Sequence, residues 1–113
     1  MAERATPAPW SAYEVGEVRA AAGRAYAEFL RVPAISAGIY RLPAGGDDPQ
    51  RPHREDELYY VITGRAVLRV DGGDRPVSPG TIVYVAAGVP HRFHSIAEPL
   101  EVLVLFAPAE TEE

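Results

Sequence analysis

From residue 25 onward, the chain alternates between short apolar runs and polar segments rich in proline and glycine. The runs contain many valines, isoleucines, leucines and aromatic residues, which favour strands, and they are short for helices. We predict strands at 25–31, 35–42, 58–63, 66–71, 75–77, 81–85, 92–95 and 101–106. Roughly eight short strands separated by turns indicate an all-β domain, built as a small sandwich or barrel.

Two turns organise the middle of this pattern. Asp71-Gly72-Gly73-Asp74 predicts a hairpin, because glycine readily adopts the positive φ that primed turns need. Gly64 and Arg65 predict a second, tight turn between the strands at 58–63 and 66–71.

The two ends of the chain differ from this pattern. Val15, Val18 and Ala22 recur at helical spacing and predict one short helix that ends at Gly23. We therefore divide the chain into an N-terminal arm with a short helix (1–23), a β-barrel (24–108) and a frayed acidic tail (109–113).

The run from Glu57 to Ile62 is apolar on both faces of a strand. Side chains alternate between faces, so Glu57, Tyr59 and Val61 share one face and Leu58, Tyr60 and Ile62 share the other. Such a strand is buried on both sides, or lies inside a barrel whose outside is covered by a partner subunit. On the interior face, Glu57 would be a buried carboxylate that needs a cation or hydrogen-bond donors.

Composition and charge exclude several classes of function. The formal net charge of −5 argues against nucleic acid as a partner. The absence of cysteine excludes disulfides and thiolate metal sites, and leaves histidine, aspartate and glutamate as the strong metal ligands. Neither a secretory signal nor a membrane-spanning apolar stretch is recognisable, so we expect a cytoplasmic protein without membrane contact.

His53, Glu57 and His91 are the candidate metal ligands. Two imidazoles and a carboxylate bind divalent first-row metals and leave coordination positions open. His53 and Glu57 are separated by about 13 Å of fully extended chain, so the backbone has to bend between them for both to reach one ion. By spacing alone, this acidic segment also fits a charged loop that leads into a strand.

The segment from Gly46 to Ser95 resembles the two motifs of the cupin family. In the first motif His53 stands at the second histidine, Glu57 at the glutamate and Gly64 at the closing glycine. In the second motif, the matching positions are Gly80, Gly88 and His91. The resemblance covers 26–108 and is closest to small single-domain cupins of the RmlC-like, conserved-barrel type. It implies a double-stranded β-helix, which is a jelly-roll barrel, and a homodimer.

The chain departs from the family pattern at three places. Arg51 occupies the position of the first histidine, so one ligand of the usual set is missing. Glu55 or Gln50 could replace it as a fourth ligand. Ala86 and Ser95 replace the motif's proline and asparagine, which concerns loop shape more than ligation.

The resemblance implies a divalent transition metal (Fe, Mn, Zn or Ni) held by His53, Glu57 and His91, with a small polar or anionic molecule bound beside it. Cupins of this kind include dioxygenases, isomerases and decarboxylases, and nothing in the sequence selects one reaction or identifies a catalytic residue. Two alternatives stay open: a non-catalytic module that binds a small molecule or a metal, and a cupin whose site is vestigial and empty.

The remaining polar and aromatic residues receive less specific interpretations. His94 has the opposite strand parity to His91, which favours a surface or packing role. Tyr40, Tyr59 and Tyr84 are expected in the core. Solvent-exposed charges are expected at three arginines and two acidic segments: Arg41, Arg69, Arg92, Asp47-Asp48 and 110–113.

Overall fold

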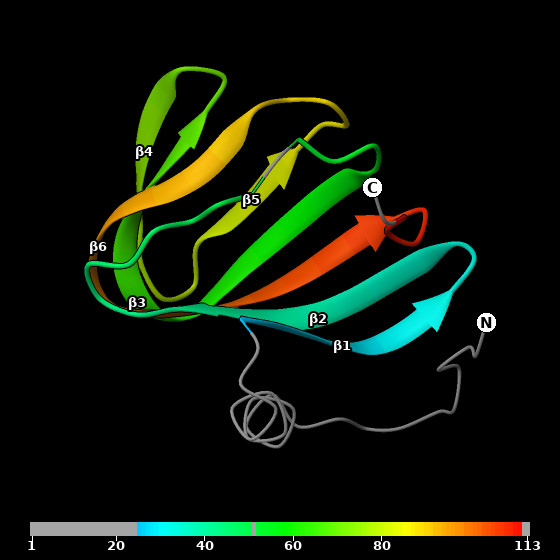
Figure 1. The fold of residues 1–113 in the computed structure, drawn as a ribbon, viewed down its shortest axis with the longest axis horizontal. Coiled ribbons are helices and arrows are strands. Elements are labelled where there is room, and N and C mark those ends of the chain that lie inside the picture. The colour runs from blue at the N-terminus through cyan, green and yellow to red at the C-terminus, as the bar shows by residue number, and fades with distance from the viewer. Residues whose placement is uncertain (1–24, 51, 112–113) are drawn as a thin grey trace.

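Six antiparallel strands form one curled sheet in the computed structural model, which describes residues 25–50 and 52–111 (Figure 1). The strands are β1 (Tyr26–Val32), β2 (Ile35–Leu42), β3 (Asp56–Val70), β4 (Gly73–Val77), β5 (Ile82–Val85) and β6 (His91–Ala107). Their order is β1-β2-β6-β3-β4, and β5 pairs with the first part of β3. The all-β jelly-roll prediction is confirmed; the predicted helix at 13–22 lies outside the described residues.

Two long strands, β3 and β6, replace four of the predicted short ones. The predicted tight turn at Gly64 and Arg65 is wrong, because β3 continues through both residues while its register with β6 shifts repeatedly between Val61 and Val67. Gly64 has a φ of 97°, so the chain bends there without reversing. The segments 92–95 and 101–106 likewise belong to one strand, and in Figure 1 both long strands cross the molecule.

Side chains along the first half of β3 alternate between two faces as predicted, but only one of these faces is buried. Glu57, Tyr59 and Val61 point inward and are at most 2 % exposed. On the other face Leu58 and Tyr60 are 37 % and 40 % exposed. The first half of β3 therefore has a buried inner face and an open outer face in the single chain.

The core fills the inside of the curled sheet. It consists of aliphatic and aromatic side chains from β2, β3, β4, β5 and β6, with Tyr59, Leu68, Phe93 and Val102 fully buried. These interior positions follow the period of two that a sheet with one buried face requires. Within residues 25–50 and 52–111, no helix has the length and apolar character needed to cross a membrane.

Candidate metal centre

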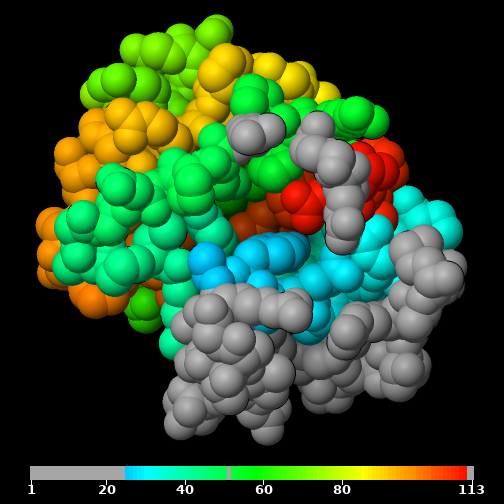
Figure 2. Space-filling model, in the orientation of Figure 1, coloured from blue at the N-terminus to red at the C-terminus, as the bar shows by residue number. Residues whose placement is uncertain are grey.

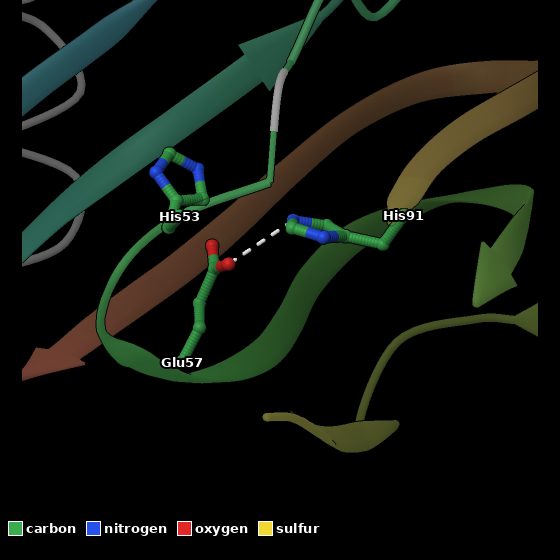
Figure 3. Close-up of side chains that lie close together, drawn as sticks. All are labelled: His53, Glu57 and His91. Carbon is green, nitrogen blue, oxygen red and sulfur yellow. Dashed lines mark ion pairs between the residues drawn. The ribbon is translucent and has the colours of Figure 1, made fainter. Parts of the chain in front are cut away.

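His53, Glu57 and His91 meet at one end of the barrel (Figure 3). His53 lies in the segment before β3, Glu57 is the second residue of β3, and His91 is the first residue of β6 rather than part of the preceding loop. One potential ligand atom from each residue lies within 4.8 Å of the others. These distances allow all three to contact a single ion.

The backbone bends between His53 and Glu57, as the reach argument requires. Arg54 and Glu55 form the bend. Its position is fixed by the loop between β5 and β6, because the Gly88 N–H donates to the His53 carbonyl at 2.7 Å and the Ala87 N–H donates to Asp56 Oδ1 at 2.9 Å. One backbone–backbone and one backbone–side-chain hydrogen bond therefore connect the two segments that match the two sequence motifs.

Glu57 and His91 form the buried half of the cluster. Their side chains are each 1 % exposed, and His91 Nε2 lies 3.1 Å from Glu57 Oε1. The other ring nitrogen, Nδ1, donates to the Val89 carbonyl at 2.9 Å, because a carbonyl can only accept. Nε2 is therefore the nitrogen that faces the cluster. Burial lowers the pKa of His91, but the contacts with Glu57 and Val89 outweigh it, so the pKa is raised overall.

Like His91, His53 directs its Nε2 toward the cluster and its Nδ1 away from it. Its Nδ1 lies 3.3 Å from Glu110 Oε2, so this nitrogen is the donor, and its Nε2 lies 3.3 Å from Gln50 Oε1. The contact with Glu110 raises the pKa of His53 against the opposing effect of burial. A metal bound at the two Nε2 atoms would have to displace any protons held there.

The carboxylate of Glu57 fits a cation. Among the described residues, neither of its oxygens, nor His91 Nε2, has a partner at hydrogen-bond geometry, although the 3.1 Å contact satisfies the distance for an ion pair. A buried charge without hydrogen bonds is costly. A metal ion at this position would neutralise the carboxylate, and it would use the lone pairs of the Glu57 oxygens and of His91 Nε2.

Gln50 is held beside the cluster by a buried aspartate. Asp48 is 5 % exposed, which contradicts the expectation of a solvent-exposed charge. Its oxygens accept from the Tyr40 hydroxyl, the Phe93 N–H and the Gln50 side-chain amide. With its amide nitrogen fixed, Gln50 directs Oε1 toward His53 Nε2 and the Tyr59 hydroxyl.

The C-terminal segment contacts this end of the barrel. Of the residues expected to form a frayed tail, 109–111 are described. The Glu110 N–H donates to Ser36 Oγ at 2.9 Å, and Thr111 donates to Glu55 Oε2 from both its N–H and its hydroxyl. The Glu110 side chain thereby reaches His53. No feature of the acidic sequence at 110–113 indicated this contact, because it depends on residues far away in the chain.

These contacts distinguish between the two residues expected as a possible fourth ligand, Glu55 and Gln50. Glu55 is buried, but its Oε2 is engaged by Thr111, and Glu55 is not part of the cluster of three potential ligands. Gln50 Oε1 lies 3.3 Å from His53 Nε2, close to the roughly 3.0 Å that separates adjacent ligands bound at about 2.1 Å. The geometry favours Gln50. Arg51, which replaces the family's first histidine, lies outside the described residues.

The remaining sequence predictions have mixed outcomes. His94 lies away from the cluster and contacts Asp74 at 3.0 Å, which confirms the surface role. Tyr40 and Tyr59 are in the core as predicted, whereas Tyr84 is 60 % exposed, which makes its core prediction wrong. Its strand, β5, lies at the outside of the sheet, so alternate residues face solvent.

A cavity of about 160 Å³ lies beside His53 and Glu57. The rings of Tyr26, Tyr40 and Phe106 form part of its wall, together with the polar residues Gln50 and Glu110. Figure 2 shows a hollow in the corresponding face, between the segment that follows β2, the start of β1 and the C-terminal segment. Sequence reasoning missed Tyr26 and Glu110 because Tyr26 begins the first strand and Glu110 follows the last one, so they are far apart in the sequence.

Comparisons with known proteins agree with this architecture. The profile of the cupin-domain family matches residues 38–106. An uncharacterized protein of Streptomyces coelicolor is 48 % identical over 98 residues, which cover 87 % of this chain and 93 % of that protein. The crystal structure of an RmlC-like cupin from Shewanella frigidimarina has a TM-score of 0.67 at 20 % identity, covering 74 % of this chain and 75 % of the other.

A second curated relative is the dimethylsulfoniopropionate lyase DddQ of Ruegeria pomeroyi. It is 30 % identical over 74 residues, which cover 65 % of this chain but 37 % of the lyase. Its crystal structure has a TM-score of 0.66 at 24 % identity, covering 75 % of this chain and 48 % of the lyase chain. This chain therefore spans less than half of the lyase.

Proposed function

Because this chain belongs to the cupin family, we propose that it holds a divalent metal ion between His53, Glu57 and His91 and presents the ion to a small molecule bound beside it. The metal would be a first-row transition metal, of which iron, manganese, zinc and nickel are all compatible with two imidazoles and one carboxylate. Such an ion acts as a Lewis acid that polarises an oxygen of a bound substrate.

The observation that carries the proposal is the unsatisfied carboxylate of Glu57. Its two oxygens are buried without hydrogen bonds within the described part of the chain, and the two imidazoles surround it. A vestigial site would be expected to have lost this costly charge or to have acquired donors for it. The preserved set of lone pairs therefore supports a functional metal site over an empty one.

The surrounding residues have distinct roles in the proposed site. Val89 and Glu110 accept from the Nδ1 atoms of His91 and His53, which keeps both Nε2 atoms directed toward the centre. Gln50 supplies a neutral oxygen on the same side. The three main ligands leave positions open for a substrate, which is the arrangement of a catalytic rather than a purely structural metal.

Two observations favour an enzyme over a non-catalytic module. The cavity beside His53 contains a carboxylate that can accept a proton, Glu110, next to the proposed open positions. One curated relative is a lyase. A binding module without turnover is the alternative, and a screen for metal-dependent conversion of small molecules, compared between the natural chain and a ligand-deficient variant, distinguishes the two.

Metal uptake tests the proposal directly. We expect the purified chain, stripped with a chelator and then dialysed against zinc or cobalt, to retain about one equivalent per chain, the number that one three-residue site can hold. Cobalt also reports ligand geometry through its visible spectrum. Retention of less than about a tenth of an equivalent of either metal, from a chain that is still folded by circular dichroism, would contradict the proposed function.

We further propose that a second copy of the chain covers the outer face of β3 and β5. Within the described residues, the four exposed large apolar side chains are Leu58, Tyr60, Ile82 and Tyr84. Leu58 pairs with Tyr84 and Tyr60 with Ile82 across the strands, so all four lie on one face. A contiguous apolar face of this kind suits a self-complementary dimer interface.

Charge introduced into this face is expected to separate the dimer. Ile82→Glu places a carboxylate at a position that is 64 % exposed in the single chain, so the fold should tolerate it while the apolar contact is lost. Sizing chromatography with light scattering should give a dimeric mass for the natural chain and a monomeric mass for the variant. The matched control is Ala97→Glu, at an exposed position on β6 outside this face. A monomeric natural chain at micromolar concentration would contradict the proposal.

A further inference from the structure

We propose that the cavity beside His53 and Glu57 binds a small organic cation, of which a quaternary ammonium group is the simplest example. The inference rests on the proposed function only in placing the bound molecule next to the metal. The properties that select a cation belong to the cavity itself: its charge, its aromatic walls and its size.

Among the described residues, two carboxylates and one histidine line the cavity, so this part of its wall is negative whether or not the histidine is protonated. Glu57 and Glu110 both line it, and no arginine among the described residues does so. Glu110 is held in place by the hydrogen bond from its N–H to Ser36 and by the contact of its side chain with His53. A divalent metal ion would carry one positive charge more than Glu57 cancels, and the carboxylate of Glu110 would balance that excess. In the metal-free chain, an anionic guest would therefore meet repulsion from both carboxylates, and a cation would meet an opposite charge.

The aromatic walls also favour a cation. The ring centroids of Tyr26 and Tyr40 are 6.5 Å apart, those of Tyr26 and Phe106 are 6.4 Å apart, and both pairs are edge-to-face. The Tyr26 ring is thus steeply inclined to both of the other rings, and all three line the cavity. Aromatic faces carry partial negative charge and attract alkylated ammonium groups, which have little hydration to lose.

The cavity contains polar atoms that the fold itself does not use. The Tyr26 hydroxyl is buried and has no hydrogen-bond partner among residues 25–50 and 52–111. The oxygens of Glu57 are also unpartnered among these residues, but the proposed metal would use them, so the Tyr26 hydroxyl is the group on which the inference depends. Burial raises the pKa of Tyr26, so its hydroxyl stays neutral, and its oxygen lone pairs can face a cation. Unsatisfied buried groups of this kind indicate a ligand rather than a packing void.

The size of the cavity and the residues around it restrict the class of ligand further. The volume of about 160 Å³ is close to that of a cavity that accepts one benzene molecule, about 150 Å³. A separate pocket is lined by Arg69, Arg92 and His91, among other residues. These arginines, which could bind an anion, therefore lie outside this cavity, which is consistent with a cationic guest. This result differs from the polar or anionic molecule expected from the sequence.

Choline and its neutral isostere, 3,3-dimethylbutan-1-ol, test the inference, because they have the same shape and differ in charge. Binding to the full chain is measured by NMR chemical-shift titration, once in excess chelator and once with zinc bound. We expect choline to bind about tenfold more tightly than the alcohol in excess chelator, and by a smaller factor with zinc bound, because zinc offsets the charge of Glu57. Glu110→Gln should reduce that preference about tenfold, because the amide oxygen still accepts from His53 but the charge is gone. Glu98→Gln, an equal change of charge at an exposed site on β6, should leave it unchanged.

Two results would overturn the inference: equal or tighter binding of the alcohol, or the same loss of preference in the Glu98 and Glu110 variants. Failure of the chain to take up zinc, with the preference for choline intact in chelator, would contradict the proposed metal function and leave the cation site standing. The two proposals can therefore fail separately.

Discussion

Replacing Glu57 by glutamine is expected to abolish stoichiometric metal binding while the barrel stays folded. Glutamine has nearly the same shape, so the 1 % exposed position remains filled, but the anionic ligand between the two imidazoles is lost. Loss of an outer contact to a ligand costs 10–100-fold in metal affinity, so loss of the charged ligand itself should cost more than about 100-fold. Competition titration with a chelating indicator measures the affinity directly.

The stability of the same variant gives an independent readout. In the metal-free chain, at a pH where His91 is neutral, removal of the buried carboxylate should leave the free energy of unfolding unchanged or raise it, because no ion pair with His91 is then lost. Glu55→Gln is the matched control: it changes the same charge two residues away, at a side chain that contacts Thr111 and not the two histidines. If Glu55→Gln loses the metal and Glu57→Gln keeps it, the assignment of Glu57 as the carboxylate ligand is wrong.

Replacing Gly64 by alanine is expected to destabilise the fold severely. A Cβ at this position would lie 2.2 Å from the Pro99 carbonyl oxygen and 2.7 Å from Leu100 Cα, and φ is 97°. Both neighbouring atoms belong to the backbone of β6, so the clash cannot be relieved by a rotamer change. Backbone strain and overpacking together should cost about 3–5 kcal/mol, measured by denaturant unfolding of the metal-free chain.

Comparison with Gly80→Ala separates the energetic cost of the positive φ from the cost of the steric clash. Gly80 has a φ of 94°, almost the same as Gly64, but a Cβ there would meet nothing within 4 Å. This variant should lose only about 1–2 kcal/mol, the cost of a left-handed conformation. Equal losses in the two variants would show that the close approach of β3 and β6 at Gly64 has no energetic importance.

Much of the fold was predictable because the relevant forces are local. Apolar runs with β-branched residues predict strands, and glycines with positive φ predict turns and bends. Gly64 shows where this reasoning is insufficient. A glycine between two apolar runs is consistent with a reversal or with a bend in one strand, and only the pairing of β3 with β6 on both sides of Gly64 distinguishes them.

The candidate site was partly predictable for a similar reason. His53, Glu57 and His91 were identifiable from residue type and from motif spacing, since few side chains bind divalent metals strongly. Asp48 and Glu110 were assigned to solvent because acidic segments are usually exposed. Their contacts with Tyr40 and His53 depend on segments distant in the chain, and no local pattern encodes such a contact.

The sequence by itself determined the all-β class, the residue types of the three candidate ligands and the need for a bend between His53 and Glu57 if both bind one ion. Only the tertiary structure decided that these residues meet. In the pairing of β3 with β6, His91 lies opposite Val70. Val70 follows Glu57 by 13 residues, which is roughly 43 Å on a straight strand. The sheet curls, and β5 pairs with Glu57 six residues before His91. Closure of the barrel therefore brings Glu57 and His91 to 3.1 Å, and no period in the sequence reports closure.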